Sequence, residues 1–198
     1  MIRNPIDVVT VSKIQKILEP FIEPITRRQN YIPDWEDYVS KKSLLSLLGE
    51  DVPRNRTSNL ERLTNYVQLN DMMLNLVKSY YSDCVVKCSG HFHYPKTGFM
   101  GWHTNHDNPH ERVYIAYATE DQKSFFRYYD CEKDEIITDY DDKGLTVRQF
   151  KVTETEPYFW HCVGSECDRF SVGFLVKSSV SLDFDVYQKL IAKMEPKD

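Results

Sequence analysis

Two histidines that lie far apart in the chain stand beside apolar segments and could bind one metal ion. His103 follows the apolar segment 98–102 and opens the polar run His-Thr-Asn-His-Asp, and His161 directly follows the apolar run 158–160. Two imidazoles with one oxygen ligand form the set that holds non-haem iron(II) and leaves coordination positions open for oxygen and a co-substrate. His103 and His161 therefore predict a catalytic metal centre.

Either of two residues could supply the oxygen ligand. Asn105 lies two positions after His103, and side chains two apart on a strand project to the same face. Its amide oxygen is neutral, whereas the carboxylate of Asp107 would offset the charge of the metal. Asp107 could reach the same ion only if residues 104–106 fold back in a turn. The sequence leaves Asn105 and Asp107 as equal candidates.

An arginine follows His161 at the start of another apolar segment. Arg169 and Ser171 would project from the same face of a strand, where they could bind a carboxylate through charge-assisted hydrogen bonds. An unpaired buried charge is costly, so a guanidinium directed into the protein needs an anion. That anion is either a carboxylate of a ligand or an internal Asp or Glu.

The remaining histidines have simpler expected roles. His91 and His93 alternate on a predicted strand and favour packing, although an H-x-H pair can also begin a cupin-type metal site. His106 and His110 lie in a polar turn, where we expect them to face solvent.

The elements that position these residues change type near residue 84. Residues 1–83 show helical periodicity over 11–22, 35–48 and a long stretch from Ser58 to 77, with Pro20 and Pro24 at the end of the first helix. Short β-branched or aromatic segments follow over 84–178, and residues 181–195 have the pattern of an amphipathic helix. We therefore predict a single α+β domain over 1–198, with N-terminal helices packed on a two-sheet jelly roll. The predicted strand segments are 85–94, 98–102, 112–118, 123–129, 135–138, 146–152, 158–162 and 169–177.

Composition disfavours several classes of protein. The net charge of −5 gives no sign of a basic face for tight nucleic-acid binding, which depends on neutralising phosphates, although a local groove of Lys and Arg stays possible. No apolar run approaches the ~18 residues that suggest a membrane span. Five cysteines, an odd number without a C-x-x-C pair, favour free thiols in a reducing cytoplasmic compartment.

Several of these segments together resemble a known family. The runs His93-Tyr-Pro, Gly98-Phe, His103 and Asp107-Asn-Pro, followed by His161 and Arg169, resemble the prolyl-hydroxylase branch of the 2-oxoglutarate and iron(II)-dependent oxygenases, and the small phage-type members of that superfamily. The resemblance implies a double-stranded β-helix that binds Fe(II) and 2-oxoglutarate, with ascorbate as a stimulating reductant. It also implies hydroxylation of a substrate with release of succinate and CO2. By the same resemblance, His103, His161 and Arg169 would be catalytic, and the 2-oxoglutarate pocket would include Tyr94, Tyr117, Arg169 and Ser171.

Two other functions remain open on sequence grounds. Because the usual His-x-Asp is His-x-Asn at 103–105, the chain could be a jelly-roll binding or scaffold module without turnover. A cupin-like metalloenzyme would instead use His91 and His93. The substrate favoured is a peptide side chain, a free amino acid or a small metabolite rather than nucleic acid, and Trp102, Phe126 and Trp160 are expected to wall its pocket.

Overall fold

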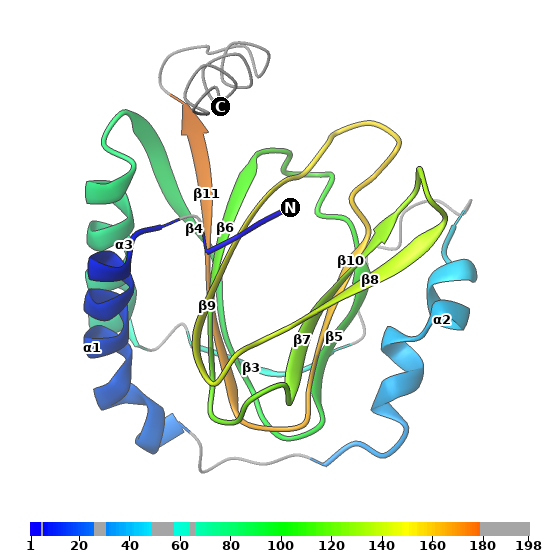
Figure 1. Ribbon diagram of the computed structural model, residues 1–198, viewed down its shortest axis with the longest axis horizontal. Helices are drawn as coiled ribbons and strands as arrows, with labels where there is room; N and C mark the ends of the chain where they lie inside the picture. Colours follow the sequence, from blue (N-terminus) through cyan, green and yellow to red (C-terminus); the bar gives the residue numbers. More distant parts are fainter. Residues whose placement is uncertain (5, 26–30, 49–57, 64–65, 179–198) are drawn as a thin grey trace, which may run out of the picture.

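Two antiparallel sheets form the centre of the molecule in the computed structural model (Figure 1). The structure describes residues 1–4, 6–25, 31–48, 58–63 and 66–178. Within these residues, one sheet has the strand order β1-β9-β6-β11-β4-β3 and the other has the order β2-β5-β10-β7-β8. The strands are β1 (Ile2–Arg3), β2 (Ser58–Asn59), β3 (Glu61–Arg62), β4 (Cys84–Tyr94), β5 (Gly98–His103), β6 (Glu111–Ala118), β7 (Ser124–Asp130), β8 (Glu135–Tyr140), β9 (Gly144–Lys151), β10 (His161–Ser165) and β11 (Arg169–Ser178).

The eight longer strands, β4 to β11, divide between the two sheets as in a jelly roll. β4, β6, β9 and β11 belong to the first sheet, and β5, β7, β8 and β10 belong to the second. Antiparallel strands shared in this way between two sheets are typical of jelly rolls. The predicted α+β class is confirmed, and each strand segment expected over 84–178 overlaps an observed strand.

Alternation along β6 decides which of its side chains face the space between the sheets. Val113 and Ile115 are buried in a hydrophobic cluster on the outer face of the first sheet. Arg112 and Tyr114 alternate with them and face the interior. Because successive side chains on a strand point to opposite faces, this one strand supplies both the core and the candidate site.

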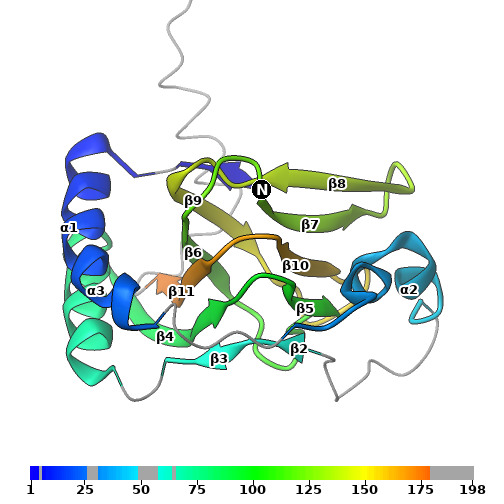
Figure 2. The same ribbon diagram turned by 90° about the horizontal axis from the view of Figure 1, so that it is seen from below.

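Two helices, α1 (Val8–Ile25) and α3 (Val67–Tyr80), cover the outer face of the first sheet (Figures 1 and 2). Asp7 caps α1, since its carboxylate accepts the backbone N–H of Thr10 at 3.0 Å. Apolar side chains at helical spacing, among them Ile14 and Met73, are fully buried against the sheet. Burial of these side chains fixes the helices on the sheet.

The outer face of the second sheet is covered from the opposite side of the molecule by a 3₁₀ helix, η1 (Trp35–Val39), and by α2 (Lys41–Leu45). Trp35 stacks on Phe125 of β7, with 6.2 Å between ring centroids. The indole N–H of Trp102 donates to the backbone oxygen of Ser40 at 2.9 Å. The helical part of the chain therefore lies on both sides of the paired sheets.

Two helix ends differ from the sequence prediction. The sequence places the end of the first helix at Pro20 and Pro24, but α1 continues to Ile25. Pro20 is exposed, and so is Lys16, whose carbonyl would otherwise receive the missing hydrogen bond, so water can replace that bond. A helix expected from Ser58 begins only at Val67, because 58–59 and 61–62 pair with β5 and β4 as short edge strands.

The helix predicted over 181–195 lies outside the described residues. None of the helices in the described part of the chain has the length and apolar character of a membrane span.

Candidate metal centre and its pocket

His103 and His161 meet between the two sheets. They are directly opposite each other in the pairing of β5 with β10. The ring centroids are 4.1 Å apart, and both side chains are buried. The prediction that these two distant residues come together is thus matched by the register of one strand pair.

Backbone carbonyls fix the proton position on both rings. His103 Nδ1 donates to the oxygen of Gly101 at 2.8 Å, and His161 Nδ1 donates to the oxygen of Phe159 at 2.9 Å. A carbonyl can only accept, so each Nδ1 carries a proton, and in the neutral imidazole each Nε2 then has the free lone pair. This is the tautomer, and the type of outer hydrogen bond, that metal-binding histidines use.

Asn105 is the third polar group of this cluster. Its side-chain amide donates to His161 Nε2 at 3.2 Å. The backbone of Asn105 has φ of 58°, in the left-handed region that Asn tolerates better than most residues. This conformation turns the chain after His103, so the amide returns toward the imidazoles.

Asp107 lies away from the imidazoles. It is exposed, in a turn where Asn108 N–H donates to the oxygen of Asn105 at 3.0 Å. Within the described ranges, no group of three or more His, Cys, Asp or Glu side chains gathers at a common point. Of the two candidate oxygen ligands, the structure brings Asn105 to the histidines and does not bring Asp107.

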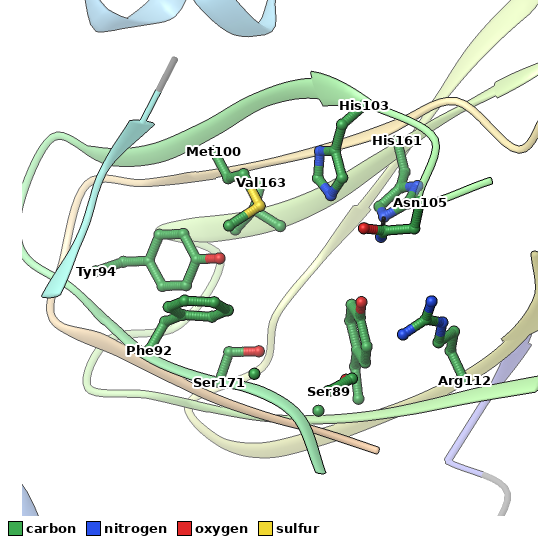
Figure 3. A pocket seen from close by; sticks show the side chains of 13 residues that line it. Ser89, Phe92, Tyr94, Met100, His103, Asn105, Arg112, His161, Val163 and Ser171 are labelled. Carbon is green, nitrogen blue, oxygen red and sulfur yellow. Dashed lines mark hydrogen bonds between the residues drawn. The ribbon is translucent and has the colours of Figure 1, made fainter. Parts of the chain in front are cut away.

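A pocket of about 60 Å³ adjoins the imidazoles (Figure 3). Figure 3 shows the amide of Asn105 beside the ring of His161, with the guanidinium of Arg112 pointing toward it from the opposite wall. Among the described residues, the lining contains hydroxyl, amide, imidazole and guanidinium groups but no carboxylate. The lining residues are Ser89, Gly90, Phe92, Tyr94, Met100, His103, Asn105, Arg112, Tyr114, His161, Val163, Ser171 and Gly173.

Aromatic rings surround His161 on its remaining sides. The rings of Phe126, Phe150 and Phe159 lie 5.3, 5.4 and 5.4 Å from the imidazole, between centroids. Phe126 is fully buried against His161, but it does not line the pocket that it was expected to wall. These apolar rings give His161 a surrounding of low polarity, in which electrostatic interactions are stronger than in water.

Arg169 is buried and paired with an acidic residue of the protein. Its Nε donates to Asp141 Oδ2 at 2.8 Å, and Arg148 donates to the other oxygen of the same carboxylate. Burial alone would raise the pKa of Asp141, but the charges of Arg169 and Arg148 and the hydroxyl of Ser124 hold it below its ordinary value. An internal acid is therefore one partner of Arg169.

Arg169 nevertheless lies close to the pocket. Its guanidinium lies over the ring of Tyr94 at 5.1 Å from the centroid, and Tyr94 lines the pocket together with Ser171. The Nη1 atom of Arg169 is buried and meets no hydrogen-bond acceptor among the described residues. Tyr94 and Ser171 thus line the pocket beside the imidazoles, and Arg169 lies behind Tyr94.

Three aromatic residues are placed differently from the sequence expectation. Tyr117 packs with Phe170 on the outer, helix-covered face of the first sheet, because it has the alternation of Val113 and Ile115. Trp102 and Trp160 belong to the cluster under η1 and α2, on the outer face of the second sheet. None of the three lines the pocket, so the expectation for them is wrong.

His91 and His93 also lie on the outer face of the first sheet. His91 Nδ1 contacts the amide oxygen of Asn70 on α3, and burial lowers the pKa of His91 to about 4. His93 donates to Asp168 at 2.8 Å and stacks on Phe170. These contacts explain both residues by packing and do not support a cupin-like site.

His106 and His110 are half-buried rather than solvent-facing. His106 Nδ1 and the hydroxyl of Thr104 form a hydrogen bond of 3.0 Å, and the His106 ring lies 5.2 Å from that of Tyr158. The turn after His103 is therefore held by its own side chains.

Arg112 and Tyr114 are two polar residues of the pocket lining that sequence reasoning missed. Arg112 is buried, and its Nη2 donates to the backbone oxygen of Asn108 at 2.6 Å. The alternation of the strand segment 112–118 could have indicated them, because it places Arg112 and Tyr114 on the same face of the strand. That alternation does not say which face of the strand borders a pocket.

The donor set of the cluster fits a divalent metal ion. Imidazole is a good ligand for iron, zinc, copper and nickel, and the amide of Asn105 meets Nε2 of His161, whose ring lies against that of His103. A half-turn of that amide exchanges its oxygen and nitrogen, so the side chain can present an oxygen. The set differs from the usual two-histidine, one-carboxylate ligands because it brings no negative charge.

Comparison with known proteins gives likenesses to solved structures. No protein-family model matches the sequence, and no curated protein matches it significantly. A Pseudomonas putida prolyl-4-hydroxylase is similar with 9% identity and a TM-score of 0.42, over 86% of this chain and 88% of that one. A Trichoplax adhaerens prolyl hydroxylase, solved with a peptide of the hypoxia-inducible factor, is similar with 11% identity and a TM-score of 0.47, over 98% and 86%. A Burkholderia pseudomallei oxidoreductase of the 2OG-Fe(II) oxygenase family is similar with 9% identity and a TM-score of 0.41, over 84% and 90%.

Proposed function

We propose that this chain is an Fe(II)- and 2-oxoglutarate-dependent oxygenase with a double-stranded β-helix fold, which hydroxylates a substrate and releases succinate and CO2. One observation carries the proposal: two buried imidazoles from paired strands line a pocket between the sheets, and each has its Nδ1 bonded to a backbone carbonyl. In this proposal His103, His161 and the amide oxygen of Asn105 hold the metal. Iron with 2-oxoglutarate supplies the activation of oxygen, which no side chain can perform.

The chain's own contribution begins with orientation. The hydrogen bonds from the Nδ1 atoms to Gly101 and Phe159 fix both rings before any ligand arrives. The rings of Phe126, Phe150 and Phe159 exclude water from one side of His161. Excluding water protects a reactive centre from side reactions.

The far end of the pocket is proposed to receive the distal carboxylate of 2-oxoglutarate. Tyr94 and Ser171 offer hydroxyl groups there, and the buried Nη1 of Arg169 lies beside the Tyr94 ring. A carboxylate that meets these groups would give Nη1 an acceptor while Nε stays bonded to Asp141. The arginine would then act as a bridge between the cofactor and the protein's own acid.

The neutral ligand set has an electrostatic consequence. Two imidazoles and an amide leave the metal's positive charge uncompensated by the protein. Binding of the metal would therefore depend strongly on the anionic co-substrate, which brings two carboxylates. We expect metal and 2-oxoglutarate to enhance each other's affinity more than in a site with its own carboxylate.

Succinate release tests the proposal. Wild-type protein incubated in air with Fe(II), ascorbate and 2-oxoglutarate is expected to form succinate, and His103→Ala is expected to fall to background. His110→Ala, a half-buried histidine outside the ligand set and outside the turn at 104–106, serves as the matched control and should retain activity. Equal succinate from wild type and His103→Ala would refute the proposal.

A binding or scaffold module without turnover is the second candidate. The observation in its favour is that the described residues bring no carboxylate to the two histidines. Metal binding that depends on His103, without succinate formation across a broad substrate panel, would favour this candidate.

A further inference from the structure

Three basic side chains lie where the face of the pocket reaches solvent. Lys87 of β4 and Arg112 of β6 are both paired with Leu175 of β11. Lys177 lies two residues farther along β11, and both lysines are exposed. We name Lys87, Arg112 and Lys177 the basic entrance.

The three side chains share the face of the sheet that forms the pocket. Residues directly opposite each other in a strand pair project from the same face, so Lys87, Leu175 and Arg112 form one row across three strands. Gly173, two residues before Leu175, lines the pocket. Lys177 continues the same alternation outward. The face of β11 therefore runs from Gly173 in the pocket to Lys177 at its rim.

The three charges of the basic entrance all act on one neighbouring residue, His110. Burial lowers the pKa of His110, and the charges of Lys177, Arg112 and Lys87 lower it further. All three of these charges are positive, and the described residues that line the pocket include no carboxylate. The described part of this entrance is therefore basic, although the whole chain has a net charge of −5. Such a local field attracts anions toward a cleft.

The shape of the groups indicates which kind of anion fits. The Arg112 guanidinium is only 3% exposed, and its bond to the carbonyl of Asn108 holds it facing the pocket. A fixed planar guanidinium matches a carboxylate in a two-point hydrogen bond. A pocket of about 60 Å³ admits the small end of a molecule. Three cations form a short patch, whereas nucleic-acid binding relies on many phosphate contacts.

We infer that the substrate of this protein carries a carboxylate, which Arg112 binds beside the His103–His161 centre while Lys87 and Lys177 attract it to the pocket. The inference rests on the proposed function, because it takes the two histidines as the place of reaction. A free acidic amino acid, an acidic peptide side chain or a small carboxylic acid would each supply this group.

The test uses protein loaded with Mn(II) and saturated with 2-oxoglutarate, so that no turnover occurs. The probes are two capped amino acids of nearly equal shape, Ac-Asp-NH2 and Ac-Asn-NH2. Paramagnetic broadening of their NMR signals reports binding close to the metal. We expect the acid to bind about 10-fold more tightly than the amide, since a charged partner roughly doubles the strength of a hydrogen bond and the two probes differ only in that group.

Matched variants assign the preference to the basic entrance. Arg112→Gln and the double variant Lys87→Gln/Lys177→Gln should each reduce the ratio of the two affinities at least about 5-fold. Because the lysines are exposed, the double variant is expected to fold even if Arg112→Gln does not. Lys13→Gln/Lys16→Gln removes the same charge from the exposed side of α1 and should leave the ratio unchanged.

Each of the remaining outcomes would overturn either this inference or the proposed function. Equal affinity for acid and amide, or an unchanged ratio in the double variant, would overturn the inference while 2-oxoglutarate still binds. Tighter binding of the oligonucleotide (dT)8 than of Ac-Asp-NH2 would overturn it in favour of nucleic acid. Failure of the wild type to bind 2-oxoglutarate in the same samples would overturn the proposed function and, with it, this inference.

Discussion

Two buried polar clusters lie toward opposite ends of the space between the sheets. One pairs arginines with acidic side chains, and the other is built from polar and basic groups. β10 begins at His161 in the pocket and ends at Ser165, which pairs with Ser124, the serine that donates to Asp141. At the Asp141 end, Arg148 and Arg169 meet acidic side chains of the protein. At the His161 end, the pocket lining has polar and basic groups but no carboxylate.

The difference indicates what each end is for. Removing one partner of a buried ion pair leaves an uncompensated charge. The groups of the Asp141 cluster are therefore needed for the stability of the folded protein. The pocket leaves imidazole, amide and hydroxyl groups directed at a cavity, where a ligand can complete them. Stability and binding are thus assigned to different ends of the same strands.

Removing the acid of the closed end is expected to have the largest effect. Asp141→Asn would leave two buried arginines without their shared carboxylate, which is expected to lower the free energy of unfolding by about 3–5 kcal/mol. Urea unfolding measures this change. Asp142→Asn is the matched control, because Asp142 is half-exposed and pairs with Arg3 at the surface, where a pair contributes less than about 1 kcal/mol. Similar losses in both variants would remove the distinction between the two ends.

Removing an imidazole of the open end should affect binding much more than folding. His103→Ala is expected to weaken Co(II) or Fe(II) binding at least about 100-fold, since even outer-shell partners of metal ligands are worth 10–100-fold. Competition with a chromogenic chelator measures the affinity, and urea unfolding measures stability. If His103→Ala destabilised the fold as much as Asp141→Asn and left metal affinity unchanged, the pocket would be a structural cluster too.

Adding a carboxylate to the open end sharpens the comparison. Asn105→Asp is compatible with the left-handed backbone and would give the metal a charged ligand, so the affinity at pH 7 should rise about 10-fold. The enhancement of metal binding by 2-oxoglutarate should shrink at the same time. Asn108→Asp, three residues on and exposed, serves as the control. An unchanged affinity in Asn105→Asp would exclude residue 105 as a ligand.

Mild acid should have the smallest effect on the closed end. The pKa of Asp141 is depressed in the folded protein, so its contribution is fully present above the unfolded value of about 3.9 and is lost as the pH falls through the folded value. The difference in unfolding free energy between wild type and Asp141→Asn should therefore change by less than about 0.5 kcal/mol between pH 7 and pH 5. It should shrink below about pH 4. Metal binding should weaken as the pH falls from 7 to 5, because protonated imidazole cannot bind a metal.

Much of the fold could be predicted from the sequence because strand periodicity is local. Segments such as 112–118 and 169–177 show alternation that survives in the structure almost unchanged. The stretch after Ser58 shows the limit of that approach. Its side chains have helical spacing, but the edges of β4 and β5 offer backbone hydrogen bonds that only the assembled sheets make available.

The residue types of the site could be predicted from the sequence. The face of the sheet on which each side chain lies could not. His103 and His161 could be identified from their settings, yet nothing local distinguishes the inner from the outer face of the strand that carries Tyr117 and Arg112. The partner of Arg169 was equally hidden, because Asp141 is distant in sequence and lies in the connection from β8 to β9, which meets Arg169 only in the assembled fold.

The left-handed backbone at Asn105 limits which residues can occupy that position. Gly, Asn and Asp are the residues that accept such a conformation most readily, and of these only Asn and Asp carry an oxygen ligand. Their codons differ in a single base. The protein therefore stands one point mutation away from the His-x-Asp pattern, and the neutral and charged forms of the site are immediate neighbours in evolution.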